Sequence, residues 1–248
     1  MKELRDDAVV LRTFKSGEAD RVVVLWTRHH GKVRVLAKGV RKVTSKMGGT
    51  LETLAHVNVD LVKTHGDFYI ARHVTHCERL TTLRSSYSRI NAGYAVVEVV
   101  DAIPSHDVAD EGIFNLVARV LMTLDDERYH PDLVPASFYF KLLAHDGSEP
   151  VVDECVNCGR SGPLVAFDSQ VGGTLCSTCR SGTAISPEAL ELVRRILQGD
   201  LANVLREADP PAAGEVMALA QNAIEVHFAR RLRAPRSAAP LAPRRTDR

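Results

Sequence analysis

Four of the five cysteines of this chain form two CxxC pairs, Cys155 with Cys158 and Cys176 with Cys179. A CxxC turn brings two thiolates within reach of one ion, and two such turns on a hairpin complete the tetrahedral set that Zn²⁺ prefers. Seventeen residues separate the pairs, and they read as an extended stretch, a glycine turn and a return. This spacing is typical of zinc ribbons and predicts one structural Zn²⁺ bound by all four cysteines.

Other uses of the cysteines have less support. A thioredoxin-like redox pair would follow a βαβ pattern, which is absent around this segment, and disulfides are unusual in a reducing cytosol. Catalytic zinc usually has three protein ligands and an open position, so a Cys₄ set favours a closed site. The fifth cysteine, Cys77, lies close to His73 and His76. Without a distant partner ligand, we interpret it as an ordinary, partly buried thiol.

A basic segment in the first fifty residues is the second chemical feature. Residues 32–46 carry six cations and no acid: Lys32, Arg34, Lys38, Arg41, Lys42 and Lys46. The first two alternate with valines, so we expect them on the solvated face of a strand, and the other four on the glycine-bounded loop that follows. Such a patch attracts nucleic-acid phosphates, although a cationic surface without a partner has the same composition.

Aromatic rings that could stack on bases are scarce near this segment. The candidates are Phe14, Trp26, Phe68 and Tyr69, and most of them are expected in the core. The predicted DNA contacts are therefore to the sugar–phosphate backbone, without sequence preference.

The 248-residue chain has a formal net charge of only +1, but its charge is unevenly distributed. Residues 1–80 carry 15 basic and 9 acidic side chains, residues 81–227 carry 10 and 21, and residues 228–248 carry 7 and 1. Contacts with a polyanion are therefore expected at the two ends of the chain. Between the outer cysteines the only charged residues are Arg160 and Asp168, so we expect the ribbon to brace the fold and not to bind DNA.

Hydrophobic patterning predicts a β-rich first part and a helical second part. Five short runs rich in valine, leucine and aromatic residues predict strands at 8–14, 21–27, 31–39, 56–64 and 67–75. Five strands in about eighty residues favour an OB-fold barrel, although an SH3-like barrel has similar statistics. Helical periodicity then predicts helices at 88–104, 111–126, 135–147, 186–199 and 213–232.

The expected fold is therefore multidomain α+β. Residues 1–80 form a five-stranded OB-fold DNA-binding domain, and residues 81–233 form a helical bundle domain with an embedded Cys₄ zinc ribbon at 150–185. Residues 234–248 are expected to form a disordered basic tail, since they lack apolar periodicity. The sequence has no apolar targeting segment and no run of the roughly 18 apolar residues that a membrane span needs, so we expect a cytoplasmic protein without membrane contacts.

Two stretches resemble the RecO family of recombination mediators. The segment GKVRVLAKGVRKVTSKMGG is similar to the basic strand and loop near the N-terminus of that family, and FYFKLLAHDGSEPVVDECVNCG with GGTLCSTC is similar to its central helix and zinc ribbon. The resemblance covers the chain up to its tail. It implies an OB-fold, a helical domain with the four cysteines as zinc ligands, and the cations of residues 32–46 as DNA contacts.

The same resemblance implies a function without catalysis. RecO proteins bind single- and double-stranded DNA, anneal complementary strands, and act with the RecR protein and the C-terminal tail of single-stranded-DNA-binding protein to help load the RecA recombinase. For that acidic and apolar tail, a basic-rimmed apolar groove on the helical domain is expected. Some family members lack the cysteines, which fits a structural metal. The implied location is the cytoplasm, at the nucleoid.

Two other classes of function remain open. One is a zinc-ribbon adaptor that binds protein partners and no DNA. The other is an enzyme that uses the cysteine hairpin as a lid, but the chain has no GxxxxGK[ST] loop, HExxH, GxSxG or dinucleotide-binding glycine motif. The sequence therefore favours a non-enzymatic DNA repair and recombination mediator.

Overall fold

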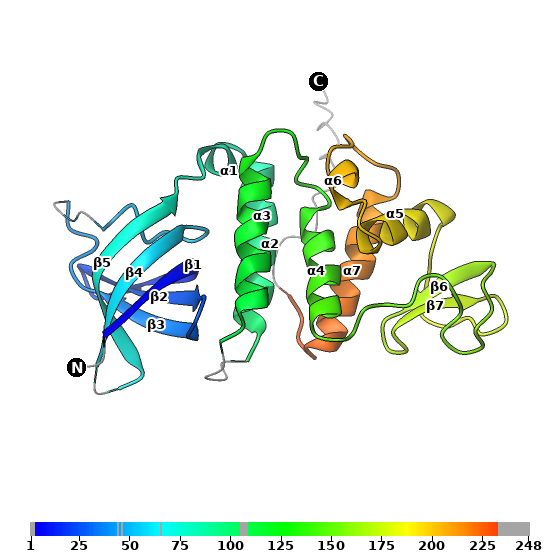
Figure 1. Ribbon diagram of the computed structural model, residues 1–248, viewed down its shortest axis with the longest axis horizontal. Coiled ribbons are helices and arrows are strands. Elements are labelled where there is room, and N and C mark those ends of the chain that lie inside the picture. The colour runs from blue at the N-terminus through cyan, green and yellow to red at the C-terminus, as the bar shows by residue number, and fades with distance from the viewer. Residues whose placement is uncertain (1–2, 44, 46, 65, 105–108, 233–248) are drawn as a thin grey trace, which may run out of the picture.

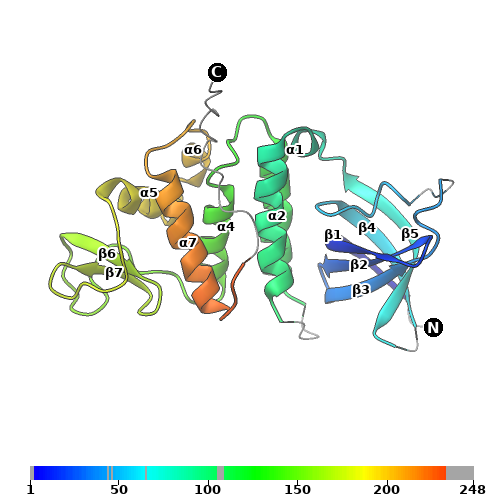
Figure 2. The ribbon, with the colours of Figure 1, turned by 180° about the vertical axis from the view of Figure 1, so that it is seen from behind.

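The computed structural model describes residues 3–43, 45, 47–64, 66–104 and 109–232. The molecule is elongated, with a β-barrel at one end, helices in the middle and a small cysteine-bearing sheet at the other end (Figures 1 and 2). Two residue predictions fall outside the described ranges: the role of Lys46 and the disordered tail at 234–248. Among the described residues, no helix is long and apolar enough to span a membrane.

The first five strands close into a barrel in the order β1-β2-β3-β5-β4. The strands are β1 (Glu3–Ser16), β2 (Asp20–Thr27), β3 (Gly31–Ala37), β4 (His56–Lys63) and β5 (Phe68–Glu78). All neighbours are antiparallel except β3 and β5, and β1 pairs with both β2 and β4 to close the sheet. This is OB-fold topology, so the OB-fold prediction is confirmed over the SH3-like alternative.

Alternation of side chains gives the barrel two apolar faces. The inner face holds the small core of the barrel, which includes Val23, Val35 and Val59. On the outer face, Val24 and Trp26 belong instead to the core of the helical part. A strand that is apolar on both faces must be covered on both, and the helices cover this part of the barrel.

The first strand begins five residues earlier than the sequence pattern predicts. Its N-terminal part is charged, but Asp6 is buried and binds the turn between β2 and β3. The backbone N–H of His29 donates to Asp6 Oδ2 at 2.8 Å, and the His30 ring nitrogen Nδ1 lies 2.9 Å from the same oxygen. These partners are distant in sequence, so the sequence near Asp6 shows only charged residues and does not indicate a strand there.

The helical part contains seven helices among the described residues. They are α1 (Thr81–Ser85), α2 (Tyr87–Ala102), α3 (Glu111–Asp125), α4 (Val134–His145), α5 (Pro187–Leu197), α6 (Leu201–Val204) and α7 (Ala213–His227). The five long helices match the predicted ones, and the two short helices, α1 and α6, were not predicted. Single turns of this length carry too little periodicity to be seen in a sequence.

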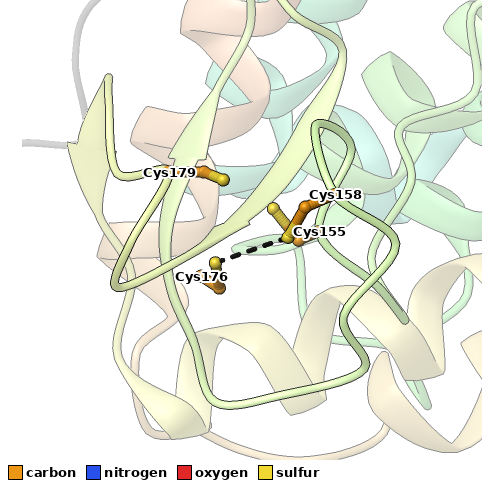
Figure 3. Close-up of side chains that lie close together, drawn as sticks. All are labelled: Cys155, Cys158, Cys176 and Cys179. Carbon is orange, nitrogen blue, oxygen red and sulfur yellow. Dashed lines mark hydrogen bonds between the residues drawn. The ribbon is translucent and has the colours of Figure 1, made fainter.

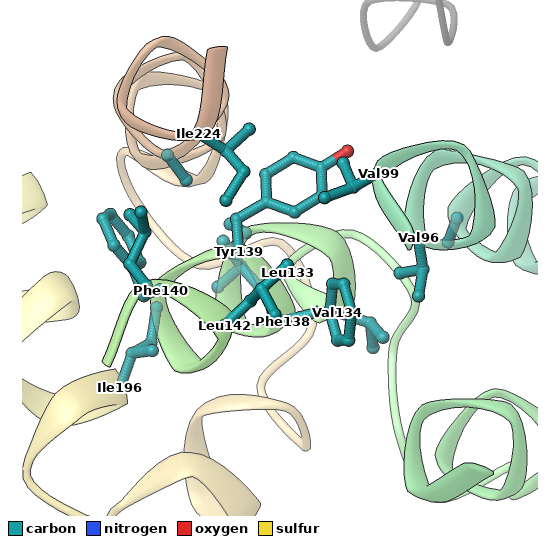
Figure 4. Close-up of a cluster of buried hydrophobic side chains, with 14 of the residues drawn as sticks. Val96, Val99, Leu133, Val134, Phe138, Tyr139, Phe140, Leu142, Ile196 and Ile224 are labelled. Carbon is teal, nitrogen blue, oxygen red and sulfur yellow. The ribbon is translucent and has the colours of Figure 1, made fainter. Parts of the chain in front are cut away.

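Helix α4 is the centre of the helical core (Figure 4). It is apolar nearly all round, and neighbouring helices surround it, as expected for such a helix. Tyr139 reaches from α4 between Ile224 of α7 and Val99 of α2 (Figure 4). Its hydroxyl donates to the carbonyl oxygen of Ala95 at 3.2 Å, which satisfies the one polar group that this ring brings into the core.

The cysteine segment forms a three-stranded sheet in the order β7-β6-β8. Its strands are β6 (Leu164–Asp168), β7 (Gly173–Cys176) and β8 (Thr183–Ala184). The hairpin β6–β7 is the extended stretch, glycine turn and return that the spacer predicts. Phe167, Val152 and Ile185 join the main helical core, so the ribbon packs on the helices through apolar side chains.

Candidate metal centre and nucleic-acid interface

The structure brings the four paired cysteines to one point (Figure 3). Their sulfur atoms all lie within 4.8 Å of one another, and the Sγ atoms of Cys158 and Cys176 are 3.7 Å apart. Four sulfurs at about 2.3 Å from a tetrahedral Zn²⁺ lie about 3.8 Å from each other. The arrangement therefore fits a Zn²⁺–thiolate site and does not fit disulfides, in which sulfurs are about 2.05 Å apart.

Backbone N–H groups favour the thiolate form at this point. The N–H of Cys176, followed by those of residues in the first CxxC turn, lowers the pKa of Cys155 to about 6. The N–H of Cys179 likewise lowers the pKa of Cys176. A hydrogen bond with the Cys158 sulfur raises the pKa of Cys179, because it stabilises the protonated thiol, and repulsion from the negative charge of Cys155 acts in the same direction. A divalent cation would remove that repulsion, so the donor set is suited to a metal ion.

The hairpin and the first CxxC turn are joined by buried hydrogen bonds. The Thr174 hydroxyl, fully buried on β7, donates to the carbonyl oxygens of Val151 and Glu154 at 3.2 and 3.0 Å. A Cβ atom at Gly173 would collide with the Val151 backbone, so only glycine allows this close approach. These contacts hold the hairpin close to the segment that leads into the first CxxC turn.

Helix α5 anchors the ribbon. Arg194 donates from Nε and Nη2 to the Val152 carbonyl at 3.2 and 3.0 Å and pairs with Asp153 at 3.0 Å. Ser186 caps the same helix by accepting from the N–H of Ala189. The ribbon is therefore tied to the helix that follows it in the chain, as a brace would be.

The remaining cysteine, Cys77, lies apart from this cluster of four. Among the described residues, Cys77 joins no group of three or more possible metal ligands. Cys77 is exposed, so the expectation of a partly buried thiol is wrong. Its thiol lies 3.7 Å from the Asp7 carboxylate, and desolvation together with that charge raises its pKa to about 11. This thiol stays protonated at neutral pH, which makes it a poor nucleophile.

Three of the predicted DNA-contacting cations lie together on the loop after β3. This loop starts at the barrel end away from the helices, since the opposite β2–β3 turn contacts α3 through Arg28 and Glu111 (Figures 1 and 2). Lys38 and Lys42 are exposed and form no ion pair with any described residue. Arg41 is exposed too, but its Nη1 donates to the carbonyls of Gly17 and Glu18, and so fixes the loop against the β1–β2 turn.

The strand cations behave differently from each other. Arg34 is exposed on the outer face of β3, as predicted, and has no ion pair within the described part of the chain. The prediction that Lys32 lies on the solvated face of the strand is wrong, because only 9% of its side chain is exposed. Its ammonium group donates to the carbonyls of Asp101 and Ile103 at the end of α2. Burial lowers the pKa of Lys32, and the nearby Asp101 carboxylate partly offsets that effect.

Two protein-family matches cover nearly the whole chain. A family model described as "Recombination protein O N terminal" matches residues 1–78, and one described as "Recombination protein O C terminal" matches residues 84–236. The chain belongs to the RecO family. Its barrel lies within the first match, and its helices from α2 onward and its cysteine ribbon lie within the second.

Curated RecO relatives from three Streptomyces species agree over most of their length. "DNA repair protein RecO" from Streptomyces coelicolor is 35% identical over 247 residues, which are 95% of this chain and 98% of the relative. The proteins of the same name from Streptomyces griseus and Streptomyces avermitilis are 34% and 36% identical over 213 and 211 residues. These alignments cover 82% and 81% of this chain, and 85% and 84% of the relatives.

Sequence analysis expected a basic-rimmed apolar groove on the helical part of this RecO-family chain but did not locate its residues. The groove, of about 320 Å³, lies between α3 and α4 and is lined by Gly112, Asn115, Leu116, Arg119, Lys141 and His145. Arg119 and Lys141 form no ion pair with any described residue. The available signal was two pairs of side chains one helical turn apart, Leu116 with Arg119 and Lys141 with His145, in a region that is otherwise acidic.

Proposed function

We propose that this protein binds single- and double-stranded DNA without sequence preference and anneals complementary strands as a recombination mediator. The exposed, unpaired cations Lys38 and Lys42 at the outer end of an OB-fold barrel support this proposal, with Arg34 and Arg41 beside them. Lys46 is also proposed as a DNA contact, because it belongs to the same basic segment of the sequence. Binding would release counterions from the phosphates and reduce the repulsion between two strands, while base pairing supplies specificity.

The proposal includes a division of work along the chain. Residues 1–80 would bind DNA, and residues 81–233 would carry the Zn²⁺-bound ribbon at 150–185 and contact protein partners. As the resemblance implies, those partners are RecR and single-stranded-DNA-binding protein, with RecA loading as the outcome. The protein would work without catalysing a reaction, in the cytoplasm at the nucleoid.

A salt titration tests the DNA-binding proposal. For the double variant Lys38→Ala/Lys42→Ala, we expect the slope of log affinity against log salt to become shallower by about 1.4, because each lost phosphate contact on a single strand contributes about 0.7. The loss should be equal for unrelated sequences. Fluorescence anisotropy with labelled oligonucleotides measures both quantities, and an annealing assay should slow in parallel.

Arg160→Ala/Arg180→Ala is the matched control, since both arginines are on the exposed surface of the ribbon. It removes the same charge at the opposite end of the molecule and should leave the slope unchanged. Wild-type protein that shows no DNA binding at low salt would contradict the proposal and favour the zinc-ribbon adaptor.

For the tail of single-stranded-DNA-binding protein, we propose the groove between α3 and α4. Arg119 and Lys141 supply unpaired positive charge beside the apolar Leu116, which suits an acidic and apolar peptide. Reversing both charges in Arg119→Glu/Lys141→Glu should weaken a labelled tail peptide at least about tenfold, while the affinity for DNA stays the same. The control Arg206→Glu alters an exposed arginine outside the groove, and equal loss in this control would exclude the groove as the site.

A further inference from the structure

The outer face of the barrel carries two neighbouring rows of side chains that cross β1, β2, β3 and β5. The strand registers place Phe14 beside Val22, Val22 beside Leu36, and Leu36 beside Ile70. The next row contains Arg12, Val24, Arg34 and Phe68 in the same strand order. Both rows face outward, because the residues that alternate with them, such as Val23 and Val35, lie in the barrel core.

Helix α2 covers only one end of this face. Val24 and Trp26 are buried against the helical core, whereas Phe14 and Phe68 remain 45% and 37% exposed. The half-buried Val22, Leu36 and Ile70 lie in the row of Phe14. The end of the barrel that carries the basic loop therefore also presents an apolar surface with an aromatic ring near each edge.

A basic side chain lies beside each of these rings. Arg12 lies over the Phe14 ring, with its guanidinium carbon 4.8 Å from the ring centroid, and it also pairs with Asp101 at 3.0 Å. Arg34 is beside Phe68 across the β3–β5 pairing and has no ion pair with any described residue. Asp67, next to Phe68 in the chain, is the exposed acid nearest to it in sequence.

We propose that this face binds the bases of single-stranded DNA, with Phe14 and Phe68 as stacking platforms and Arg34 as a phosphate contact. The inference rests on the proposed DNA binding and adds a preference for single strands. Aromatic rings between basic side chains on a barrel face are suited to unpaired bases, whose flat surfaces are free to stack. In a duplex, the flat surfaces of the bases are already stacked on neighbouring base pairs.

The spacing of the rings indicates that each would contact a different base. Phe14 and Phe68 lie in neighbouring rows on strands three places apart, so their separation across the strands alone is about 14 Å along the sheet. A strand several nucleotides long would reach both rings, in keeping with the roughly 4–16 nucleotides that OB-folds bind. The basic loop at Lys38 continues the face at the end of β3 and would hold the next phosphates.

Leucine substitutions test the stacking directly. Phe14→Leu and Phe68→Leu keep an apolar surface but remove the ring, so each should weaken binding to a short oligothymidine about fivefold or more. Affinity for a duplex of the same length should not change. The salt slope should also stay at the wild-type value, because no charge is lost, whereas Lys38→Ala/Lys42→Ala changes it. Tryptophan at either position should restore affinity, since it retains a ring that can stack.

Tyr87→Leu is the matched control, because Tyr87 is 79% exposed at the start of α2 and lies outside this face. An oligonucleotide with 5-iododeoxyuridine should crosslink to Phe14 or Phe68 under light. If wild-type protein binds DNA with the expected salt slope but the double leucine variant binds single strands equally well, the inference is wrong and the proposed function stands. Absence of wild-type DNA binding would instead overturn both.

Discussion

At the scale of single residues, the structure separates cations that look alike in the sequence. Lys32 and Arg34 are two positions apart on β3 and face the same side, yet one is buried against the end of α2 and the other is free. Lys32 satisfies two carbonyl oxygens that α2 leaves without intrahelical partners. The positive charge of Lys32 therefore stabilises the contact between the barrel and α2.

Replacing this lysine should reduce stability and leave DNA binding intact. We expect Lys32→Met to lower the free energy of unfolding by about 2–3 kcal/mol, because two buried carbonyl groups lose a charged donor. Lys38→Met is the control, since that side chain is exposed and should change the unfolding free energy by less than about 0.5 kcal/mol. Urea denaturation measures the difference. A Lys32→Met protein with wild-type stability and weakened DNA binding would show that Lys32 contacts DNA after all.

At the scale of elements, one close contact fixes the barrel on the helices. Gly93 of α2 faces Leu54, a buried residue just before β4 whose φ of 71° is in the left-handed region. A Cβ atom at position 93 would lie 2.9 Å from Leu54 Cδ1. The Leu54 side chain is buried in the helical core, and its backbone N–H donates to the Val10 carbonyl at 3.0 Å, so the residue has little room to move.

A larger side chain at this contact should therefore be destabilising. We expect Gly93→Val to lower the free energy of unfolding by about 1–3 kcal/mol through overpacking, in spite of the loss of a helical glycine. Gly214→Ala is the control, because Gly214 lies in α7 with open space around its Cβ position. That change should stabilise the protein by about 0.5–1 kcal/mol. Equal effects of the two changes in thermal unfolding would disprove the close contact.

At the scale of the whole molecule, the strongest motif and the proposed DNA surface lie at opposite ends (Figure 1). The ribbon contacts the helical core through Phe167 and the anchor at Arg194, and the basic loop belongs to the barrel. Metal binding and DNA binding are therefore expected to be separable, and coupled only through the stability of the helical part.

Removal of the metal tests this separation. Because binding free energy at such sites contributes to folding, chelation should expose the amides of residues 150–185 to hydrogen exchange and lower the unfolding temperature. DNA affinity should remain within about twofold of the metal-bound protein below that temperature, since the barrel keeps its own core. Elemental analysis should find one zinc per chain before chelation and none after. Unchanged thermal unfolding of metal-free protein would disprove the bracing role.

Local patterning was enough to predict most of the architecture. The alternation of Val33 and Val35 and the paired cysteines each act within a few residues, so they are visible in one sequence. The early start of β1 was missed because a search for apolar residues does not detect a buried aspartate such as Asp6. The groups that bind Asp6 are more than twenty residues away in the sequence. The short helices were missed because single turns have no period to detect.

The sequence by itself determined the OB-fold barrel, the long helices and the convergence of four cysteines, since hydrophobic period and CxxC spacing are local physical constraints. Only the tertiary structure decided which cations are free and where they lie. The ammonium group of Lys32 is hydrogen-bonded to the end of a helix about seventy residues away. Arg119 and Lys141 line one groove because α3 packs against α4. Whether a cationic side chain is exposed and whether it has a partner depend on contacts between segments that are distant in sequence. Those contacts exist only in the folded chain.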